Sequence, residues 1–315
     1  LEASRIDGAG PFRFFWDTAN PKNGLVPDRY PTPAFSSIAA VGFGLTSYPI
    51  GVERGYITRK EARKRVLATL RFLWNAPQGP HQHGMAGYKG FFYHFLDMKT
   101  GERYDDSELS TVDTALLIAG ALFCQSYFDG AQPEEVEIRD LADALYRRVD
   151  WHWAQPHAPA IDLGWSPEDG FLEYDWRGYN EAMLVYVLAL GSPTSPVGQD
   201  AWNEWTSTYD ATSWRTLFGQ EFLNFAPLFG HQYTHVWFDF RKLQDSYMRR
   251  RGIDYFENTR RAIYAQQAYA IANPRGCKDY GATVWGITAS DGPADVELGN
   301  GSTTRLFRTY AARGA

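Results

Sequence analysis

The chain has 315 residues, of which 44% are hydrophobic, so it holds enough apolar material for a large core and is not a disordered protein. Its formal net charge is −6 and it has no basic cluster, which argues against a nucleic-acid partner. No apolar run is long enough to span a bilayer, so membrane insertion is not expected. The two cysteines, Cys124 and Cys277, do not make a disulfide framework, and the apolar surroundings of Cys124 place it in the core.

Most of the chain is predicted to be helical, because apolar residues recur every three or four positions. The predicted helices span residues 34–47, 58–74, 109–128, 134–149, 179–190, 199–209 and 255–272. The second of them begins with Thr58 and Glu61 in a capping-box arrangement, and Pro133 stands at a favoured first position of the fourth. An apolar helix is followed at least twice by an amphipathic one, which is the pattern expected of two concentric helix layers.

Strand signals are weak by comparison. Residues 91–96 are predicted to form half of a hairpin, with residues 99–101 as its turn. Strands and helices do not alternate regularly, which argues against a parallel α/β sheet. Because no low-complexity linker divides the chain, we predict a single domain over residues 1–315.

One short stretch holds four carboxylates within nine residues, those of Asp105, Asp106, Glu108 and Asp113. It runs directly into the third predicted helix, which is apolar. Carboxylates that lead into a buried helix are costly unless they are paired, hydrogen-bonded or used in chemistry. Asp113 fits a capping box with Ser110, whereas Glu108 is less readily explained as a cap. A catalytic role is the other interpretation of both residues.

Glu181 is a further carboxylate at the start of a buried segment. The residues that follow it are apolar on all sides, which indicates a helix enclosed by the protein. An acid at this position commonly does no more than stabilise the positive end of a helix. The functional alternative is a general acid whose pKa is raised by an apolar wall.

Aromatic residues are unusually frequent, since 11 Trp, 19 Tyr and 20 Phe make up 16% of the chain. Many of them lie beside Gly, Pro, Asp or Asn, as at residues 16–17, 90–93, 165–167 and 174–176. Aromatic rings with polar neighbours suit sugars, because the rings pack on C–H surfaces while the polar groups bind hydroxyls. Core packing must account for most of these rings, and we expect a handful to line a binding site.

Several motifs together carry a resemblance to a known family. They read RFFWD at residues 13–17, NPKNGL at 20–25, GFFYHF at 90–95, ELSTVDT at 108–114, YNE at 179–181, DFR at 239–241 after His235, and WGITASDG at 285–292. With them the chain, from about residue 12 to residue 293, resembles the bacterial glucoamylase-like (glycoamylase) family. This family includes endo-β-1,2-glucanases and the glycoamylase-like domain of cyclic β-1,2-glucan synthases. Membership implies an all-α fold, an α/α barrel (toroid) of helix hairpins with a glycan cleft at one end.

The resemblance also implies a function and a set of site residues. It implies a glycoside hydrolase that cleaves glucan, of the β-1,2 type before others, by acid–base catalysis with paired carboxylates. The candidate catalytic residues are Glu181, Glu108 and Asp113, and the sequence does not say which is the acid and which is the base. The candidate substrate-binding residues are Trp16, Asp17, Phe92, Tyr93, His94, Asp105, Trp165, Trp176, Tyr179, His235, Trp237, Asp239, Arg241 and Trp285.

The C-terminus departs from the family pattern. Members carry a further C-terminal portion of roughly a hundred residues, the size of a small domain. That portion holds another acidic motif and the helices that close the barrel. This chain ends at Ala315 after an unfamiliar segment that starts at residue 300. We therefore expect a fragment or a divergent ending, with a barrel that is incomplete at the C-terminus.

No metal and no cofactor are predicted. His231 and His235 have the spacing of a zinc pair but lack the Glu that a metalloprotease places after the first His, and His81 and His83 lie in a Gly- and Pro-rich loop. The side chains of Asp239 and Arg241 are expected to form an ion pair or the wall of a sugar subsite instead of a catalyst.

Two alternative functions stay open. The chain could be a carbohydrate-binding domain without catalysis, or a polysaccharide lyase on the same barrel, although the net charge of −6 disfavours an acidic substrate. The expected partner is an oligo- or polysaccharide, and the chain is expected to act as a monomer. A periplasmic or secreted location is expected, with the cytoplasm as the alternative, because no leader is visible before Leu1.

Overall fold

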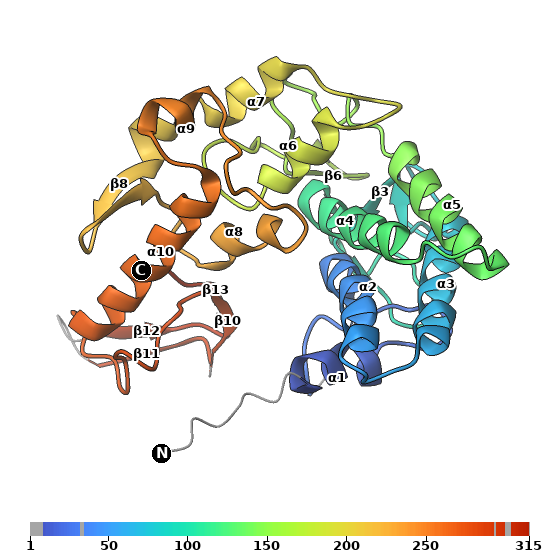
Figure 1. The fold of residues 1–315 in the computed structure, drawn as a ribbon, viewed down its shortest axis with the longest axis horizontal. Coiled ribbons are helices and arrows are strands. Elements are labelled where there is room, and N and C mark those ends of the chain that lie inside the picture. The colour runs from blue at the N-terminus through green and yellow to red at the C-terminus, as the bar shows by residue number, and fades with distance from the viewer. Residues whose placement is uncertain (1–8, 32–34, 293, 300–303, 315) are drawn as a thin grey trace. The chain divides into compact units, whose positions relative to one another are not determined.

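The structure, a computed structural model, describes residues 9–31, 35–292, 294–299 and 304–314 (Figure 1). The chain forms two compact units. Unit 1 comprises Leu1–Trp176 and Leu184–Ala201, and unit 2 comprises Arg177–Met183 and Trp202–Ala315.

The described residues of unit 1 that precede residue 150 form the helices α1 (Ala9–Thr18), α2 (Ile38–Glu53), α3 (Arg59–Asn75), α4 (Thr111–Tyr127) and α5 (Pro133–Arg148). Helices α2 and α4 lie side by side, and α5 packs against both α4 and α3 (Figure 1). Helix α4 buries most of its side chains, whereas α3 and α5 bury one face each. Within unit 1, an apolar helix is thus paired with an amphipathic one, as the sequence predicts.

The predicted helix starts of unit 1 are confirmed where they rest on local caps. Thr58 and Glu61 form a complete capping box at the start of α3, and Pro133 is the first residue of α5. Ser110 caps α4 through its hydroxyl, which accepts the backbone N–H of Asp113 at 3.2 Å. Helix α2 begins at Ile38, and residue 34, where this helix was predicted to start, lies outside the described residues.

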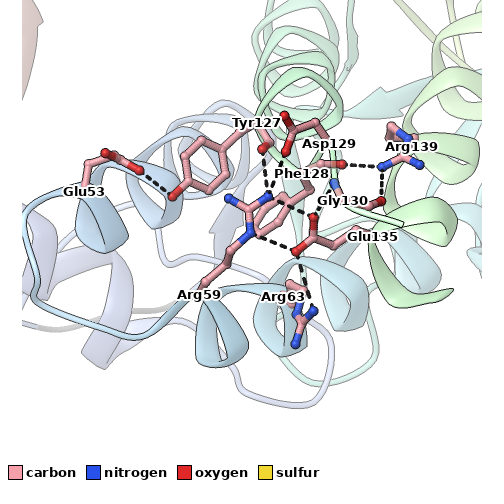
Figure 2. A network of polar contacts seen from close by, with 9 residues as sticks. All are labelled: Glu53, Arg59, Arg63, Tyr127, Phe128, Asp129, Gly130, Glu135 and Arg139. Atoms are coloured by element: carbon pink, nitrogen blue, oxygen red, sulfur yellow. Dashed lines mark hydrogen bonds and ion pairs between the residues drawn. The ribbon is translucent and has the colours of Figure 1, made fainter. Parts of the chain in front are cut away.

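Glu135, near the start of α5, is the centre of a polar network that joins α5 to α3 (Figure 2). Its side chain is only 1% exposed, and it accepts hydrogen bonds from Nε and Nη2 of Arg59, each at 2.8 Å. The backbone N–H of Gly130 donates to the same carboxylate at 2.8 Å, and Arg63 lies 3.5 Å from it. The hydrogen bonds from Arg59 lower the pKa of Glu135 to about 2, against the opposing effect of burial. The network therefore pairs a buried charge with several donors.

Helices α2 and α4 cross at a close contact between two glycines. A Cβ atom on Gly120 would lie 2.2 Å from the carbonyl oxygen of Gly42, and one on Gly42 would lie 2.3 Å from the carbonyl oxygen of Leu116. Backbone atoms cannot turn aside as a flexible side chain can, so neither position has room for a side chain.

We expect Gly120→Ala to lower the free energy of unfolding by about 1–3 kcal/mol, because overpacking outweighs the better helix propensity of alanine. The control is Gly10→Ala in α1, where no heavy atom of the described residues lies within 4 Å of the new Cβ. This control is expected to be neutral or to gain up to about 1 kcal/mol. Urea unfolding of both variants checks the prediction, and equal stabilities would contradict the close crossing.

Short strands complete unit 1. Strands β2 (Gly87–Tyr88), β3 (Phe91–Tyr93), β5 (Leu109–Ser110), β6 (Gly164–Ser166) and β7 (Gly170–Phe171) form an antiparallel sheet in that order. The all-α description is therefore too narrow for the described residues. These strands have two or three residues each, too few to produce a visible alternation in the sequence.

The predicted hairpin at residues 91–96 takes a different form from the one expected. Strand β4 (Phe95–Leu96) pairs with β1 (Ser36–Ser37), and β3 pairs with β2 and β5. The predicted turn at residues 99–101 is present, because the Asp97 side chain accepts the backbone N–H groups of Lys99 and Thr100, each at 2.8 Å. It is closed by a bridge between Leu96 and Arg103.

Two helices have residues in both units, namely α6 (Met183–Leu190) and α7 (Gln199–Thr206). Unit 2 continues with a π-helix (Tyr209–Ser213), the hairpin of β8 (Trp214–Leu217) and β9 (Gln220–Leu223), α8 (Phe229–Gln232), a 3₁₀ turn (Thr234–Val236), α9 (Ser246–Arg251) and α10 (Tyr255–Ala272). Strand β9 packs on α10, and Phe222 joins Ala262 and Ala265 in a small core. Asp254 caps α10, whose bounds agree with the predicted helix.

The end of the described chain adds two strand pairs, β10 (Ala289–Asp291) with β13 (Tyr310–Ala312), and β11 (Val296–Leu298) with β12 (Arg305–Phe307). Of the unfamiliar C-terminal segment, residues 300–303 and 315 lie outside the described residues. Cys124 is fully buried, as predicted. Among the described residues, no helix combines the length and the apolar character needed to cross a membrane.

Candidate active site

Unit 1 brings two of the predicted catalytic carboxylates to one histidine. His94 Nδ1 lies 2.8 Å from Glu108 Oε1, and His94 Nε2 lies 3.6 Å from Asp113 Oδ2. The Ser110 hydroxyl donates to the same Asp113 oxygen at 2.5 Å. The side chains of His94 and Glu108 are 31% and 35% exposed, so this cluster can be reached from solvent. Asp113 thus contacts both Ser110, which caps α4, and His94, and its catalytic role stays a prediction.

The backbone sets the geometry of this cluster. The N–H of His94 donates to the carbonyl oxygen of Glu108 at 2.8 Å, and the pairing of β3 with β5 places Tyr93 opposite Leu109. Strand β5 leads without a loop into α4, so the first turn of that helix presents Asp113 to the other ring nitrogen of His94. The adjoining ends of two paired strands and the start of a helix therefore hold the three side chains together.

The charges in the cluster support one another. Burial disfavours the imidazolium, but the carboxylates of Asp113 and Glu108 outweigh it and raise the pKa of His94 to about 9. Burial also opposes ionisation of Glu108, yet the hydrogen bond from His94 holds the pKa of this carboxyl below its ordinary value. At neutral pH the site therefore contains an imidazolium and an ionised Glu108.

A row of aromatic rings continues from His94. The His94 ring stacks on Phe95 with 3.9 Å between centroids, Phe95 packs on Phe35 at 4.4 Å, and Phe35 packs on Tyr104 at 4.9 Å. Phe35, Phe95 and Tyr104 are each partly exposed. Such a row beside a carboxylate pair has the character of a sugar-binding wall.

We expect His94 to titrate near pH 9 in the folded protein, against about 6.5 in the unfolded chain. Because the folded pKa is the higher one, the contribution of His94 to stability is complete below pH 6.5 and is lost as the pH rises through about 9. NMR titration of the imidazole signals gives the midpoint directly. The melting temperature of the wild type should fall over this pH range in part because His94 loses its charge. In the His94→Gln variant the melting temperature should fall less over the same range. A midpoint near 6.5 would contradict the assigned charges.

The aromatic residues of β3 are not site residues in this structure. Phe91, Phe92 and Tyr93 are all 0% exposed. Phe91 packs edge-on against Trp151, and the guanidinium of Arg103 lies over the Tyr93 ring. The prediction that Phe92 and Tyr93 contact substrate is corrected on this ground, because the centre of the sheet buries them and leaves no ring face for a sugar.

The other aromatic candidates of unit 1 are half-buried. Trp16 packs against Tyr48 and lies under the guanidinium of Arg65 at 4.4 Å, while its neighbour Asp17 is exposed. Trp165 packs on Trp153 with other rings of the sheet. These rings keep some accessible surface, and a sugar contact by them stays a prediction.

Two more candidates lie on either side of the carboxylate cluster in the sequence. Trp176 is half-buried and donates its indole N–H to Thr111 Oγ1 at 2.9 Å, which ties it to the first residue of α4. Asp105 is exposed, with a positive φ of 51°. Neither residue is among those that contact His94.

Glu181 belongs to unit 2, where it occupies a turn two residues before the first residue of α6. Its neighbour Asn180 accepts the backbone N–H of Ala182 at 3.1 Å and so shapes this turn. Because Glu108 and Asp113 lie in unit 1, the expectation that all three acids share one cleft stays a prediction.

Tyr179 is a core residue of unit 2. It is 3% exposed, and its ring stacks parallel to Tyr255 with 6.2 Å between centroids. Burial raises the pKa of Tyr179 to about 12. The prediction that its side chain binds substrate is therefore corrected, since the packing of unit 2 covers the ring.

The two histidines with zinc-like spacing make protein contacts in unit 2. His231 is buried and its Nε2 lies 3.0 Å from the carbonyl oxygen of Phe225, while His235 Nε2 lies 2.9 Å from Thr259 Oγ1. Burial lowers the pKa of His231 to about 3 and that of His235 to about 4, so both rings are neutral. His235 packs against Phe240, which leaves only part of its ring open.

The remaining candidates of unit 2 are at its surface. Asp239 and Arg241 form a bidentate ion pair, with 2.6 Å between Oδ2 and Nη2, and both are exposed. The hydrogen bonds from Arg241 lower the pKa of Asp239 to about 2, so this acid does not carry a transferable proton at neutral pH. Trp285 is 37% exposed and Trp237 is half-buried.

Comparison with known proteins relates this chain to one class of protein. A family model described as "Putative glucoamylase" matches residues 173–315. The "Exo beta-1,2-glucooligosaccharide sophorohydrolase (non-reducing end)" of Parabacteroides distasonis is 29% identical over 311 residues, which cover 89% of this chain and 41% of that protein. The chain thus spans less than half the length of this curated relative.

Solved structures share the fold over nearly the whole chain. The crystal structure of a "putative glucoamylase" from Bacteroides fragilis NCTC 9343 is 30% identical with a TM-score of 0.81, covering 96% of this chain and 70% of that one. An endo-beta-1,2-glucanase from Chitinophaga pinensis, in complex with sophorotriose and glucose, is 26% identical with a TM-score of 0.80, covering 96% and 71%. The chain belongs to the glucoamylase-like family.

Proposed function

We propose that this chain is the catalytic part of a glycoside hydrolase that cleaves β-1,2-linked glucan. The observation that carries the proposal is the cluster in which Glu108 and Asp113 share His94. His94 and Glu108 are partly exposed, and the cluster lies beside a row of aromatic rings. Hydrolysis of a glycosidic bond needs a proton donor and an ionised carboxylate. This cluster supplies the ionised carboxylate. The similarity to a sophorohydrolase and an endo-β-1,2-glucanase supports the choice of substrate.

The roles of the acids follow from their charges. Glu108, which is ionised next to the His94 imidazolium, suits the base or the charge that stabilises an oxocarbenium-like transition state. Asp113 orients His94 from its other side. The general acid then falls to Glu181, the third candidate carboxylate, and the proposed architecture is an α/α barrel. The single domain, the monomeric state and the periplasmic or secreted location are part of the same proposal.

The test is product analysis with the full-length gene product, because the chain spans 41% of a curated relative. Linear β-1,2-glucan is incubated beside β-1,3-, β-1,4- and α-1,4-glucans, and the products are separated by chromatography. We expect saturated oligosaccharides from β-1,2-glucan alone. Products with an unsaturated ring from a parallel incubation with a uronic-acid polysaccharide would indicate a lyase, and glucan binding without any product would indicate a carbohydrate-binding domain.

A further inference from the structure

Two carboxylates face each other in unit 1, away from the His94 cluster. Asp162 and Asp175 are opposite residues of an antiparallel bridge, flanked by backbone hydrogen bonds from Leu163 N to Tyr174 O at 3.1 Å and from Trp176 N to Ile161 O at 2.8 Å. Side chains at opposite positions of such a bridge project on the same side, and like charges there are destabilising. Something must compensate the repulsion.

Asp162 is the less easily explained of the two. It is 0% exposed, and its Oδ1 accepts the backbone N–H of Gly164 at 2.9 Å. Among the residues that the structure describes, its buried Oδ2 has no hydrogen-bond partner. Burial raises the pKa of Asp162 to about 6, and the Asp175 carboxylate adds to this effect while the Gly164 N–H opposes it. Asp162 therefore presents a buried carboxylate oxygen that no described residue satisfies with a hydrogen bond.

A histidine completes the set. His157 Nδ1 lies 3.7 Å from Asp175 Oδ1, and one ligand atom from each of His157, Asp162 and Asp175 lies within 4.8 Å of the others. The His157 side chain is 65% exposed, so an ion has a path from solvent. Ligand atoms on one ion are about 3–4 Å apart, given bonds of about 2 Å. The ligand atoms must therefore move closer together to bind one ion, and the exposed imidazole of His157 is free to contribute to that movement.

We propose that His157, Asp162 and Asp175 bind a divalent transition-metal cation, with Zn²⁺ as the ion that fits best. One imidazole nitrogen and two carboxylate oxygens are a mixed set that suits Zn²⁺ better than Mg²⁺ or Ca²⁺, which prefer oxygen alone. Three protein ligands leave the fourth tetrahedral position to water. The cation would neutralise the opposed carboxylates and occupy the open lone pair of Asp162.

The site has a structural consequence for the start of α4. The carbonyl oxygen of Asp162 accepts a hydrogen bond from Thr111 Oγ1 at 2.8 Å, and the indole of Trp176 donates to the same hydroxyl. Thr111 is the first residue of α4. A bound cation would therefore tie the segment that contains Asp162 to the one that contains Asp175 and, through Thr111, to this helix.

The test is a titration of chelator-treated full-length protein with Zn²⁺ by calorimetry, with Mn²⁺ and Ca²⁺ in parallel. We expect one Zn²⁺ per chain and a rise in melting temperature on binding. Loss of a group that only supports a metal ligand already costs about 10- to 100-fold in affinity, so His157→Ala and Asp162→Asn should each weaken Zn²⁺ binding by at least about 100-fold. The matched control is His81→Ala, another exposed histidine, which should bind as the wild type does.

Absence of Zn²⁺ binding in the wild type, or equal binding by His157→Ala, would overturn the proposal. A raised stability of Asp162→Asn together with no Zn²⁺ binding by the wild type would do so as well, since it would mean that a shared proton separates the carboxylates. If Asp162→Asn fails to fold, Zn²⁺ binding by His157→Ala remains as the test, because the His157 side chain is exposed and its replacement should not disturb the core. Glucan cleavage is not the readout, so failure here leaves the proposed function untouched.

Discussion

Replacement of Glu181 by Gln is expected to lower turnover of β-1,2-glucan by about 10²- to 10⁴-fold, the usual contribution of a general acid or base. Gln keeps the shape and the hydrogen-bonding capacity of Glu but has no transferable proton, so folding and glycan binding should persist. The measurement is turnover and melting temperature on the same preparation of full-length protein.

The competing role of Glu181 is purely structural. As a partner for the positive end of α6 it would contribute up to about 1 kcal/mol of stability and nothing to the rate per folded molecule. Near-normal turnover of Glu181→Gln would therefore remove it from the mechanism. Glu102→Gln, which changes an exposed glutamate in a turn of unit 1, serves as the control and should leave both quantities unchanged.

Glu135→Gln is expected to lower the free energy of unfolding by about 3–5 kcal/mol, the range for breaking a buried ion pair. The amide would leave Arg59 and Arg63 without their anion in a site where the Glu135 side chain is 1% exposed. The lowered pKa of Glu135 gives an independent check. Its contribution to stability is complete above about pH 4.5 and is lost as the pH falls through about 2.

The same helix provides a matched control for Glu135. Glu137 also forms a bidentate pair with an arginine, Arg71, but these side chains are 39% and 54% exposed. Exposed pairs contribute roughly 0–1 kcal/mol, so Glu137→Gln should change stability little. Urea unfolding of the two variants checks both values, and equal losses would mean that burial does not set the energy of these pairs.

The parts of the fold that depend on local signals could be predicted from the sequence. The capping box at Thr58, the first-turn Pro133 and the start of α10 all lie within a few residues of the pattern that predicts them. The sheet of unit 1 could not be predicted in this way. Strand β5 has two residues and exists because β3 and β6 flank it, and β6 follows about fifty residues later in the chain.

The candidate site shows the same division. Glu108 and Asp113 stood out because carboxylates precede an apolar helix, but nothing local indicates that His94 lies between them. Polar neighbours in the sequence also do not show whether an aromatic side chain is buried. Phe92 is flanked by motif residues, and its side chain is nevertheless buried within a sheet. Nothing local in the sequence indicates the group of His157, Asp162 and Asp175, because a backbone bridge between distant residues brings Asp175 to the other two.

The backbone hydrogen bond between His94 and Glu108 also bears on how this chain can vary. The hydrogen bond joins the backbone N–H of His94 to the carbonyl oxygen of Glu108 at 2.8 Å and does not depend on the side chains. The segment between the two residues can therefore vary in length while the pair still forms. Its exposed tip at Lys99 and Thr100 is the place where insertions would be absorbed, whereas the bridge between Leu96 and Arg103 closes the turn below it. Evolution could thus reshape the loop beyond this pair without rebuilding the pair itself.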